Sequence, residues 1–145
     1  GDIESIELPF PPGYFDAIMC ADVLEHTRDP WAVLRRLRPL LSDTASLVIS
    51  VPNIGYLPVV LKIVFDRFEY APHGVLDRGH LRFFTRHTGI DMLNTTGFVV
   101  DKVEANRGRG WKAMLVSIGS LGLLHSTNII QHRVRAHKKF ESSAL

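Results

Sequence analysis

The sequence predicts a domain of the α/β class, in which parallel strands alternate with helices. The chain has 145 residues, of which 46% are apolar, enough to build one core. Two short apolar runs, residues 15–20 and 45–51, have the length and composition of strands. A helical pattern lies between them. Strand, helix and strand in this order form a βαβ unit, which implies a parallel pair with a right-handed crossover.

The first predicted strand is FDAIMC at residues 15–20, after the turn signal PPG at residues 11–13. We expect this strand to be buried. A helix is predicted to begin at Pro30, because Asp29 can cap it and proline suits the first helical position. Pro39 would cost about 3 kcal/mol inside a helix, so we expect a kink or a tightened last turn there.

The second strand, ASLVISV, resembles a strand that is buried on both faces. An apolar pattern then predicts a helix over residues 56–65. Residues 66–85 show no clean period, and their aromatic content predicts a long ordered loop over a site. Thr85 can cap a helix that extends to Asn94 and ends at Gly97. Three further elements are predicted: a strand over residues 98–105, a helix over residues 113–124 and a strand over residues 129–139.

Charge and composition exclude several classes of partner. The 17 Lys and Arg residues are spread among 15 Asp and Glu residues, so nucleic acid is not an expected partner. The basic run HRVRAHKK at residues 132–139 could contact phosphate, but an exposed edge strand protected by charge explains it better. The uncharged stretch at residues 113–131 has too many polar and small residues for a spanning helix, and we expect no membrane partner.

Cys20 is the only cysteine, so no internal disulfide can form and nothing indicates an oxidising compartment. The N-terminal residues GDIESIELPF have neither the basic start nor the apolar run of a secretory signal. We therefore expect a cytoplasmic protein.

Four segments together carry a family likeness: residues 1–41, LVISVPN at 47–53, LDRGHLRFFT at 76–85 and TGF at 96–98. In this order and spacing they resemble the second half of a class I S-adenosylmethionine-dependent methyltransferase of the small-molecule type. The resemblance implies S-adenosylmethionine as cofactor. It also implies a Rossmann-like sheet of strand order 3-2-1-4-5-7-6 with the last strand antiparallel, of which this chain carries strands 4-5-7-6.

The first three strands of such a sheet have no counterpart here, nor do the glycine-rich turn and the acidic residue that hold the cofactor in this family. NRGRGW at residues 106–111 follows no strand that opens a helix, and we interpret it as a surface turn. We therefore interpret residues 1–145 as a single partial methyltransferase domain that is inactive alone. The missing N-terminal half, or a second chain, is expected to pair with the strand at residues 15–20.

The resemblance also implies five cofactor-binding residues. Asp2 matches the acidic residue that accepts a hydrogen bond from the adenine amino group, and Ile3 follows it. A solvated terminal aspartate is the alternative interpretation of Asp2. Ala21, Asp22 and Val23 follow the first strand at the switch in strand order, where ligands of open α/β sheets bind. The family places this turn beside the sulfonium group.

Three interpretations of Glu25 and His26 stay open. They could bond to backbone at the start of the helix, or they could take a proton from the acceptor, since histidine titrates near neutral pH. Alternatively, some members of the superfamily hold a divalent cation with a Glu and a His in this turn, and Asp22 and His80 could add ligands. We predict His26 and His80 as the catalytic residues and expect no metal ion. A hydrogen bond from His80 that fixes the loop is the alternative for that residue.

The other loop residues are expected to support this site. Leu81, Phe83 and Phe84 are predicted to anchor the loop in the core, while Phe68 and Tyr70 line a pocket for a small-molecule methyl acceptor. The predicted activity is methyl transfer from S-adenosylmethionine to an oxygen, nitrogen or carbon nucleophile. The alternative is a non-catalytic interaction module with a degenerate methyltransferase fold.

Overall fold

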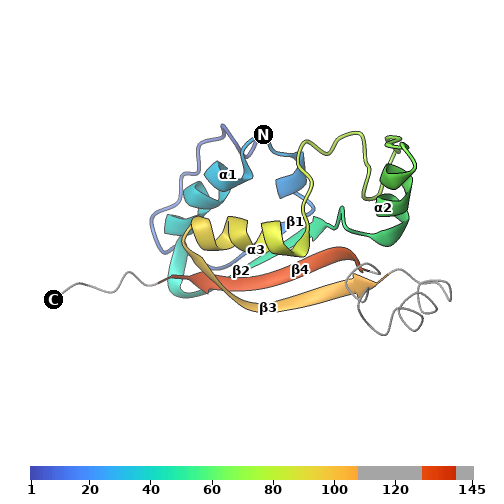
Figure 1. Cartoon of the computed structure of the whole chain (residues 1–145). Coiled ribbons are helices and arrows are strands. Elements are labelled where there is room, and N and C mark those ends of the chain that lie inside the picture. The colour runs from blue at the N-terminus through green and yellow to red at the C-terminus, as the bar shows by residue number, and fades with distance from the viewer. Residues whose placement is uncertain (108–128, 140–145) are drawn as a thin grey trace.

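The computed structural model describes residues 1–107 and 129–139, which form a four-stranded mixed sheet with helices on one face (Figure 1). The strand order is β1-β2-β4-β3. β1 and β2 are parallel, and β4 is antiparallel to both β2 and β3. This arrangement confirms the predicted fold class and matches the 4-5-7-6 half of the expected sheet. The strands are β1 (Phe15–Ala21), β2 (Leu41–Pro52), β3 (Phe98–Arg107) and β4 (Ile129–Lys138).

Helix α1 (Pro30–Leu37) begins and ends as its sequence predicts. The side chain of Asp29 accepts a hydrogen bond from the Ala32 amide at 2.9 Å, and Pro30 occupies the first turn. A 3-10 turn, Arg38–Leu40, follows directly and contains Pro39. Because proline cannot continue the α-helical hydrogen bonds, the last turn tightens before β2 begins.

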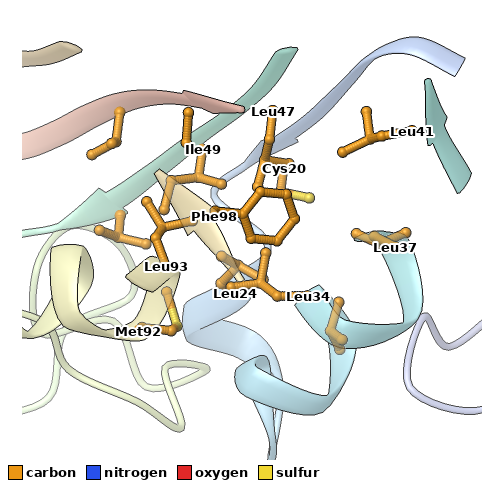
Figure 2. Close-up of a cluster of buried hydrophobic side chains, with 14 of the residues drawn as sticks. Cys20, Leu24, Leu34, Leu37, Leu41, Leu47, Ile49, Met92, Leu93 and Phe98 are labelled. Carbon is orange, nitrogen blue, oxygen red and sulfur yellow. The ribbon is translucent and has the colours of Figure 1, made fainter. Parts of the chain in front are cut away.

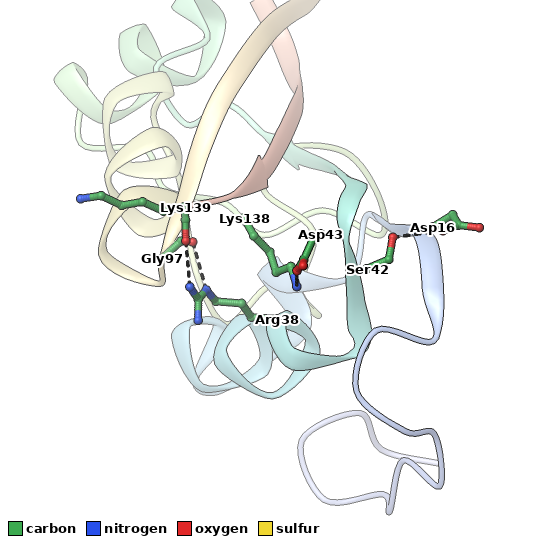
Figure 3. A network of polar contacts seen from close by, with 7 residues as sticks. All are labelled: Asp16, Arg38, Ser42, Asp43, Gly97, Lys138 and Lys139. Atoms are coloured by element: carbon green, nitrogen blue, oxygen red, sulfur yellow. Dashed lines mark hydrogen bonds and ion pairs between the residues drawn. The ribbon is translucent and has the colours of Figure 1, made fainter. Parts of the chain in front are cut away.

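Helix α3 (Arg86–Thr95) is held by a capping box between Thr85 and Thr88 and is followed by Gly97, which has a φ of +86°. Arg38 lies against this glycine: its Nε donates to the Gly97 carbonyl at 3.1 Å and its Nη2 donates to the Lys139 carbonyl at 3.0 Å (Figure 3). A Cβ atom at Gly97 would lie 2.7 Å from Nε. The end of α1 is thereby tied to the start of β3 and the end of β4.

The hydrophobic core lies between the sheet and the helices α1 and α3 (Figures 1 and 2). β1 is less buried than we expected. Of its side chains only Cys20 is buried, while Met19 is 72% exposed. The prediction of a strand is confirmed and the prediction that it is buried is wrong, because β1 lies at the edge of the described sheet.

The basic strand β4 does not lie at an edge, so that part of the sequence interpretation is wrong. β4 pairs with β2 on one side and with β3 on the other. Two of its basic side chains lie near carboxylates. His137 Nδ1 is 2.6 Å from Asp101 Oδ1, and Lys138 Nζ is 2.9 Å from Asp43 Oδ1 (Figure 3). The pair of Lys138 and Asp43 offsets part of the positive charge of the strand.

Helix α2 (Leu57–Val64) and the ordered loop at residues 65–85 follow β2, as predicted. Phe84 anchors the loop: it is buried, and its carbonyl accepts a hydrogen bond from the Ile54 amide at 2.9 Å. Phe83 is half-buried, whereas Leu81 is 48% exposed and does not anchor the loop. The predicted helix at residues 113–124 lies outside the described residues. Within residues 1–107 and 129–139, every helix is too short or too polar to cross a membrane.

Candidate functional site

The turn after β1 is held over the end of β2 by Asp22. This residue has a φ of +53°, and its amide donates to Ser50 Oγ at 3.0 Å. Its Oδ1 accepts hydrogen bonds from Ser50 Oγ at 3.1 Å and from Gln131 Nε2. Asp22 is thus fixed at the carboxyl ends of the parallel strands, where we predicted a ligand. Ser50 and Gln131 were not predicted as site residues, although Ser50 is a polar residue between the apolar residues Ile49 and Val51 near the carboxyl end of β2.

A 3-10 turn, Leu24–His26, comes next and is docked onto the loop at residues 65–85. The carbonyl of Glu25 accepts hydrogen bonds from the amides of Leu81, at 2.8 Å, and Arg82, at 3.1 Å. The guanidinium group of Arg82 donates to the carbonyl of Arg28. These bonds bring His80 to the turn although the two segments are more than fifty residues apart.

The carboxylate of Glu25 is completely buried, and none of the described residues donates a hydrogen bond to either of its oxygens. Burial raises the pKa of Glu25 to about 7. The backbone amide of Glu25 itself opposes this rise, the carboxylate of Asp22 adds to it, and His26 opposes it. None of the backbone groups at the start of the helix thus makes a full hydrogen bond to this carboxylate, and the nearby Glu25 amide stabilises its charged form only in part.

His26 and His80 both use Nδ1 to hold the loop. Nδ1 of His26 lies 3.0 Å from the Gly79 carbonyl oxygen, and Nδ1 of His80 lies 3.1 Å from that of Val75. A carbonyl oxygen can only accept, so Nδ1 carries the proton in each ring and Nε2 of the neutral ring keeps its lone pair. The ring centroids are 4.8 Å apart. A hydrogen bond that fixes the loop, which we gave as the alternative role of His80, is therefore present. It leaves Nε2 of His80 available.

Glu25, His26 and His80 bring their ligand atoms together. One such atom from each residue lies within 4.8 Å of those of the other two. Glu25 and His80 are buried, whereas His26 is exposed. Chemically, the arrangement can take up a proton at an imidazole nitrogen or bind a divalent cation.

Aromatic side chains lead from this group along the loop. The rings of His80 and Phe83 are 6.3 Å apart, those of Phe83 and Phe68 are 5.8 Å apart, and those of Phe68 and Tyr70 are 5.4 Å apart. Phe68 is 44% exposed and Tyr70 is 58% exposed. The residues that we predicted to line an acceptor pocket thus form a continuous set beside His80.

The predicted cofactor residues lie on two segments. Ala21 is exposed at the end of β1, and Val23 is half-buried against the core. Asp2 is exposed, and its Oδ1 accepts a hydrogen bond from the Glu4 amide at 2.9 Å. Ile3 packs against the core. The N-terminal segment of Asp2 and Ile3 is held at α1, where Arg36 Nη1 donates to the Ile3 carbonyl at 2.7 Å.

The methyltransferase domain family matches residues 2–103, well over half of the chain. A ubiquinone biosynthesis O-methyltransferase from Xanthomonas euvesicatoria is 26% identical over 106 residues, which cover 68% of this chain and 44% of that protein. An enzyme of the same name from Xanthomonas campestris is 43% identical over 42 residues, which cover 29% of this chain and 18% of that protein. The chain thus spans less than half the length of these curated relatives.

Solved structures share the fold. An S-adenosylmethionine-dependent methyltransferase from Archaeoglobus fulgidus has a TM-score of 0.63 at 16% identity, and the match covers 89% of this chain and 62% of that one. The methyltransferase in a complex with the Haloferax volcanii Trm112 methyltransferase activator has a TM-score of 0.62 at 11% identity. That match covers 97% of this chain and 60% of the other. At these identities the likeness shows the fold alone.

Proposed function

Because the chain belongs to the methyltransferase domain family, we propose that its natural protein transfers a methyl group from S-adenosylmethionine to a small-molecule nucleophile. The observation that carries this proposal is the position of Glu25, His26 and His80 beside the Asp22 turn, at the carboxyl ends of β1 and β2. Ligands of open α/β sheets bind at this edge. The nucleophile is an oxygen, nitrogen or carbon atom, and the names of the Xanthomonas relatives favour oxygen.

In the proposed reaction the acceptor attacks the methyl carbon, and a new bond to that carbon forms while the carbon–sulfur bond breaks. The electron pair of the broken bond stays on sulfur, which leaves S-adenosylhomocysteine. The acceptor loses its proton to Nε2 of His26 or His80, which hydrogen bonds at Nδ1 orient. Most of the rate increase then comes from holding donor and acceptor in line.

For the cofactor, we propose contacts from both segments of predicted residues. Asp2 accepts a hydrogen bond from the adenine amino group, with Ile3 beside it, while Ala21, Asp22 and Val23 lie next to the methionine part. The rigid position of Asp22 supports this role, because its bonds to Ser50 and Gln131 set the turn before any ligand arrives.

Calorimetry with S-adenosylmethionine tests the proposal on the longest natural polypeptide that contains this sequence. We expect binding, and we expect Asp2→Asn to weaken it by about tenfold, since one hydrogen bond to a charged group is worth roughly 1.5 kcal/mol. Glu7→Gln is the matched control, because Glu7 is an exposed carboxylate on the same segment. If that polypeptide binds no S-adenosylmethionine, the proposal fails and the non-catalytic interaction module takes its place.

A further inference from the structure

We infer that the groove at the C-terminal end of α2 is a binding site for an amphipathic organic acid, an apolar molecule that carries one carboxylate. The groove has a volume of about 450 Å³, and sites for small molecules commonly measure roughly 300–1,000 Å³. The binding site stands on its own geometry, whereas the assignment of this acid as the methyl acceptor rests on the proposed methyl transfer. The residues that line the groove are Pro58, Leu61, Lys62, Phe65 and Arg67.

The end of α2 builds one wall of this groove. Asp66 has a φ of +59°, a left-handed conformation that reverses the direction of the chain after a helix. The Phe65 amide donates to the Leu61 carbonyl at 3.1 Å, and the Arg67 amide donates to the Lys62 carbonyl at 2.8 Å. Backbone hydrogen bonds therefore hold Arg67 beside the last turn of α2, so the groove does not need a ligand in order to form.

Leu61 and Phe65 supply the apolar surface of the groove. Their side chains are 47% and 74% exposed, respectively. Val59 of the same helix is instead buried, and it packs with Val75 and Leu76 of the following loop. An apolar ligand that covers Leu61 and Phe65 would remove their surface from water, which favours binding.

Arg67 supplies the charge that recognises an acid. Within residues 1–107 and 129–139, no carboxylate forms an ion pair with its guanidinium group. Nζ of the nearby Lys62 is 3.8 Å from Glu69 Oε2, and both side chains are exposed, so this ion pair is weak. A guanidinium group binds a carboxylate through two parallel hydrogen bonds. The single charge of Arg67 matches a carboxylate better than a phosphate monoester, which carries nearly two negative charges.

Aromatic side chains connect the groove with the candidate site. Phe68 directly follows Arg67, and its ring lies 5.8 Å from that of Phe83, which lies 6.3 Å from that of His80. An apolar molecule whose carboxylate binds Arg67 can extend along these rings towards His80. The acceptor that fits this arrangement has its nucleophile at one end and its acid group at the other.

Calorimetry with decanoate tests the site on the longest natural polypeptide that contains this sequence. Decyltrimethylammonium is the matched probe, because it has the same apolar chain and the opposite charge. We expect decanoate to bind and the cationic probe to bind at least about tenfold more weakly. Arg67→Gln should lower the decanoate affinity by about tenfold or more, since hydrogen bonds to a charged group are lost. Arg78→Gln is the matched control, because Arg78 is exposed on the same loop but does not line the groove.

Either of two results would refute the site: decanoate that binds no more tightly than decyltrimethylammonium, or Arg67→Gln that binds decanoate like the wild type. Phe65→Ser is a second variant, because it removes the apolar wall and leaves the charge. Both residues are exposed, so these substitutions leave the core intact. Unchanged decanoate affinity in Phe65→Ser would also count against the groove.

A comparison of decanoate with hexanoate tests the connection to His80. The longer chain of decanoate extends further from Arg67, so Phe68→Ala should weaken decanoate binding several-fold and leave hexanoate binding unchanged. Phe68 is exposed, and its loss should not unfold the loop. If decanoate affinity is the same in Phe68→Ala and the wild type, the acid does not extend towards His80, and its assignment as the methyl acceptor is overturned.

Sedimentation with phosphatidylglycerol vesicles distinguishes a dissolved acid from a lipid surface. We expect the protein to stay in the supernatant. Vesicle binding that Arg67→Gln abolishes, in a protein that does not bind decanoate, would overturn the site.

Calorimetry with S-adenosylmethionine separates this inference from the proposed function. We expect the same cofactor affinity for Arg67→Gln and the wild type. A protein that binds the cofactor but not decanoate keeps the proposed function and refutes the site. Decanoate binding without cofactor binding supports the site but overturns the proposed function, and with it the assignment of the acid as the methyl acceptor.

Discussion

Glu25 and His132 are both buried, and no described residue offers a hydrogen bond to either side chain, yet their surroundings differ. His132 lies in the middle of the sheet, on β4, opposite Val51 of β2 and Ala105 of β3. Glu25 lies in a turn beyond the end of β1, with ligand atoms of His26 and His80 within 4.8 Å.

The charges near the two residues also differ. Burial lowers the pKa of His132, and the Arg86 guanidinium lowers it further, so this imidazole stays neutral and fills space in the core. Among the described residues, the only cluster that could hold a cation is that of Glu25, His26 and His80. A single buried polar group without a partner is a cost to stability, whereas such a group facing further ligand atoms indicates a binding site.

The largest expected effect is the pH dependence of stability that Glu25 produces in a chelating buffer. Its pKa rises from 4.5 to about 7 in the folded state, so between these values the folded protein binds more protons than the unfolded chain. The free energy of unfolding should therefore fall as pH rises from 4.5 to 7, by about 3 kcal/mol in all. Urea unfolding at pH 5 and pH 8 measures this difference. The titratable groups that lie near Glu25 are Asp22, His26 and His80.

Glu25→Met is the control for that measurement, because it keeps the volume and removes the ionisable group. We expect it to remove most of the loss between pH 5 and pH 8. A wild-type protein whose stability does not decrease over this range would show that another group satisfies the carboxylate. The difference drawn between Glu25 and His132 would then disappear.

His132 should produce a smaller effect of the opposite sign. Its pKa is lowered, so the unfolded chain binds more protons below about pH 6.5, and stability should fall as the solution becomes more acidic. His132→Leu should raise the free energy of unfolding by roughly 1 kcal/mol at pH 7, because two buried nitrogens without partners are removed. The stability of the His132→Leu variant should also depend less steeply on pH below pH 7. Thermal unfolding between pH 5 and pH 7 measures this dependence. His87→Leu, at an exposed position, should not reproduce this gain.

Local signals explain why so much of the fold could be predicted from the sequence. Asp29 and Pro30 start α1, Pro39 tightens its end, and Thr85 starts α3, because caps and prolines act within one turn of chain. The order of the strands came from the family resemblance. The exposure of β1 and the central position of β4 depend instead on which strands are adjacent, and no local pattern encodes that.

The candidate site could be predicted only in part for the same reason. Asp22, Glu25, His26 and His80 stood out as chemically capable side chains, but their partners come from elsewhere in the fold. Ser50 is 28 residues from Asp22 in sequence, and Gly79 is 53 residues from His26. The choice between base and metal ligand depends on these contacts, since hydrogen bonds to Nδ1 decide which nitrogen is available.

The smallest effect concerns Gly79, whose carbonyl orients His26. A Cβ atom at this position would lie 3.3 Å from His26 Nδ1 and 3.2 Å from Asp77 Oδ1, so Gly79→Ala should tilt the imidazole without removing its hydrogen bond. We expect this tilt to lower the free energy of unfolding by roughly 0.5 kcal/mol, the cost of moving a side chain away from its preferred rotamer. Gly89→Ala is the matched control: its Cβ would meet nothing closer than 3.8 Å, and alanine should stabilise α3 by about 1 kcal/mol. Urea unfolding measures both changes, and a Gly79→Ala variant that is stabilised as much as Gly89→Ala would show that His26 has room to move at this position.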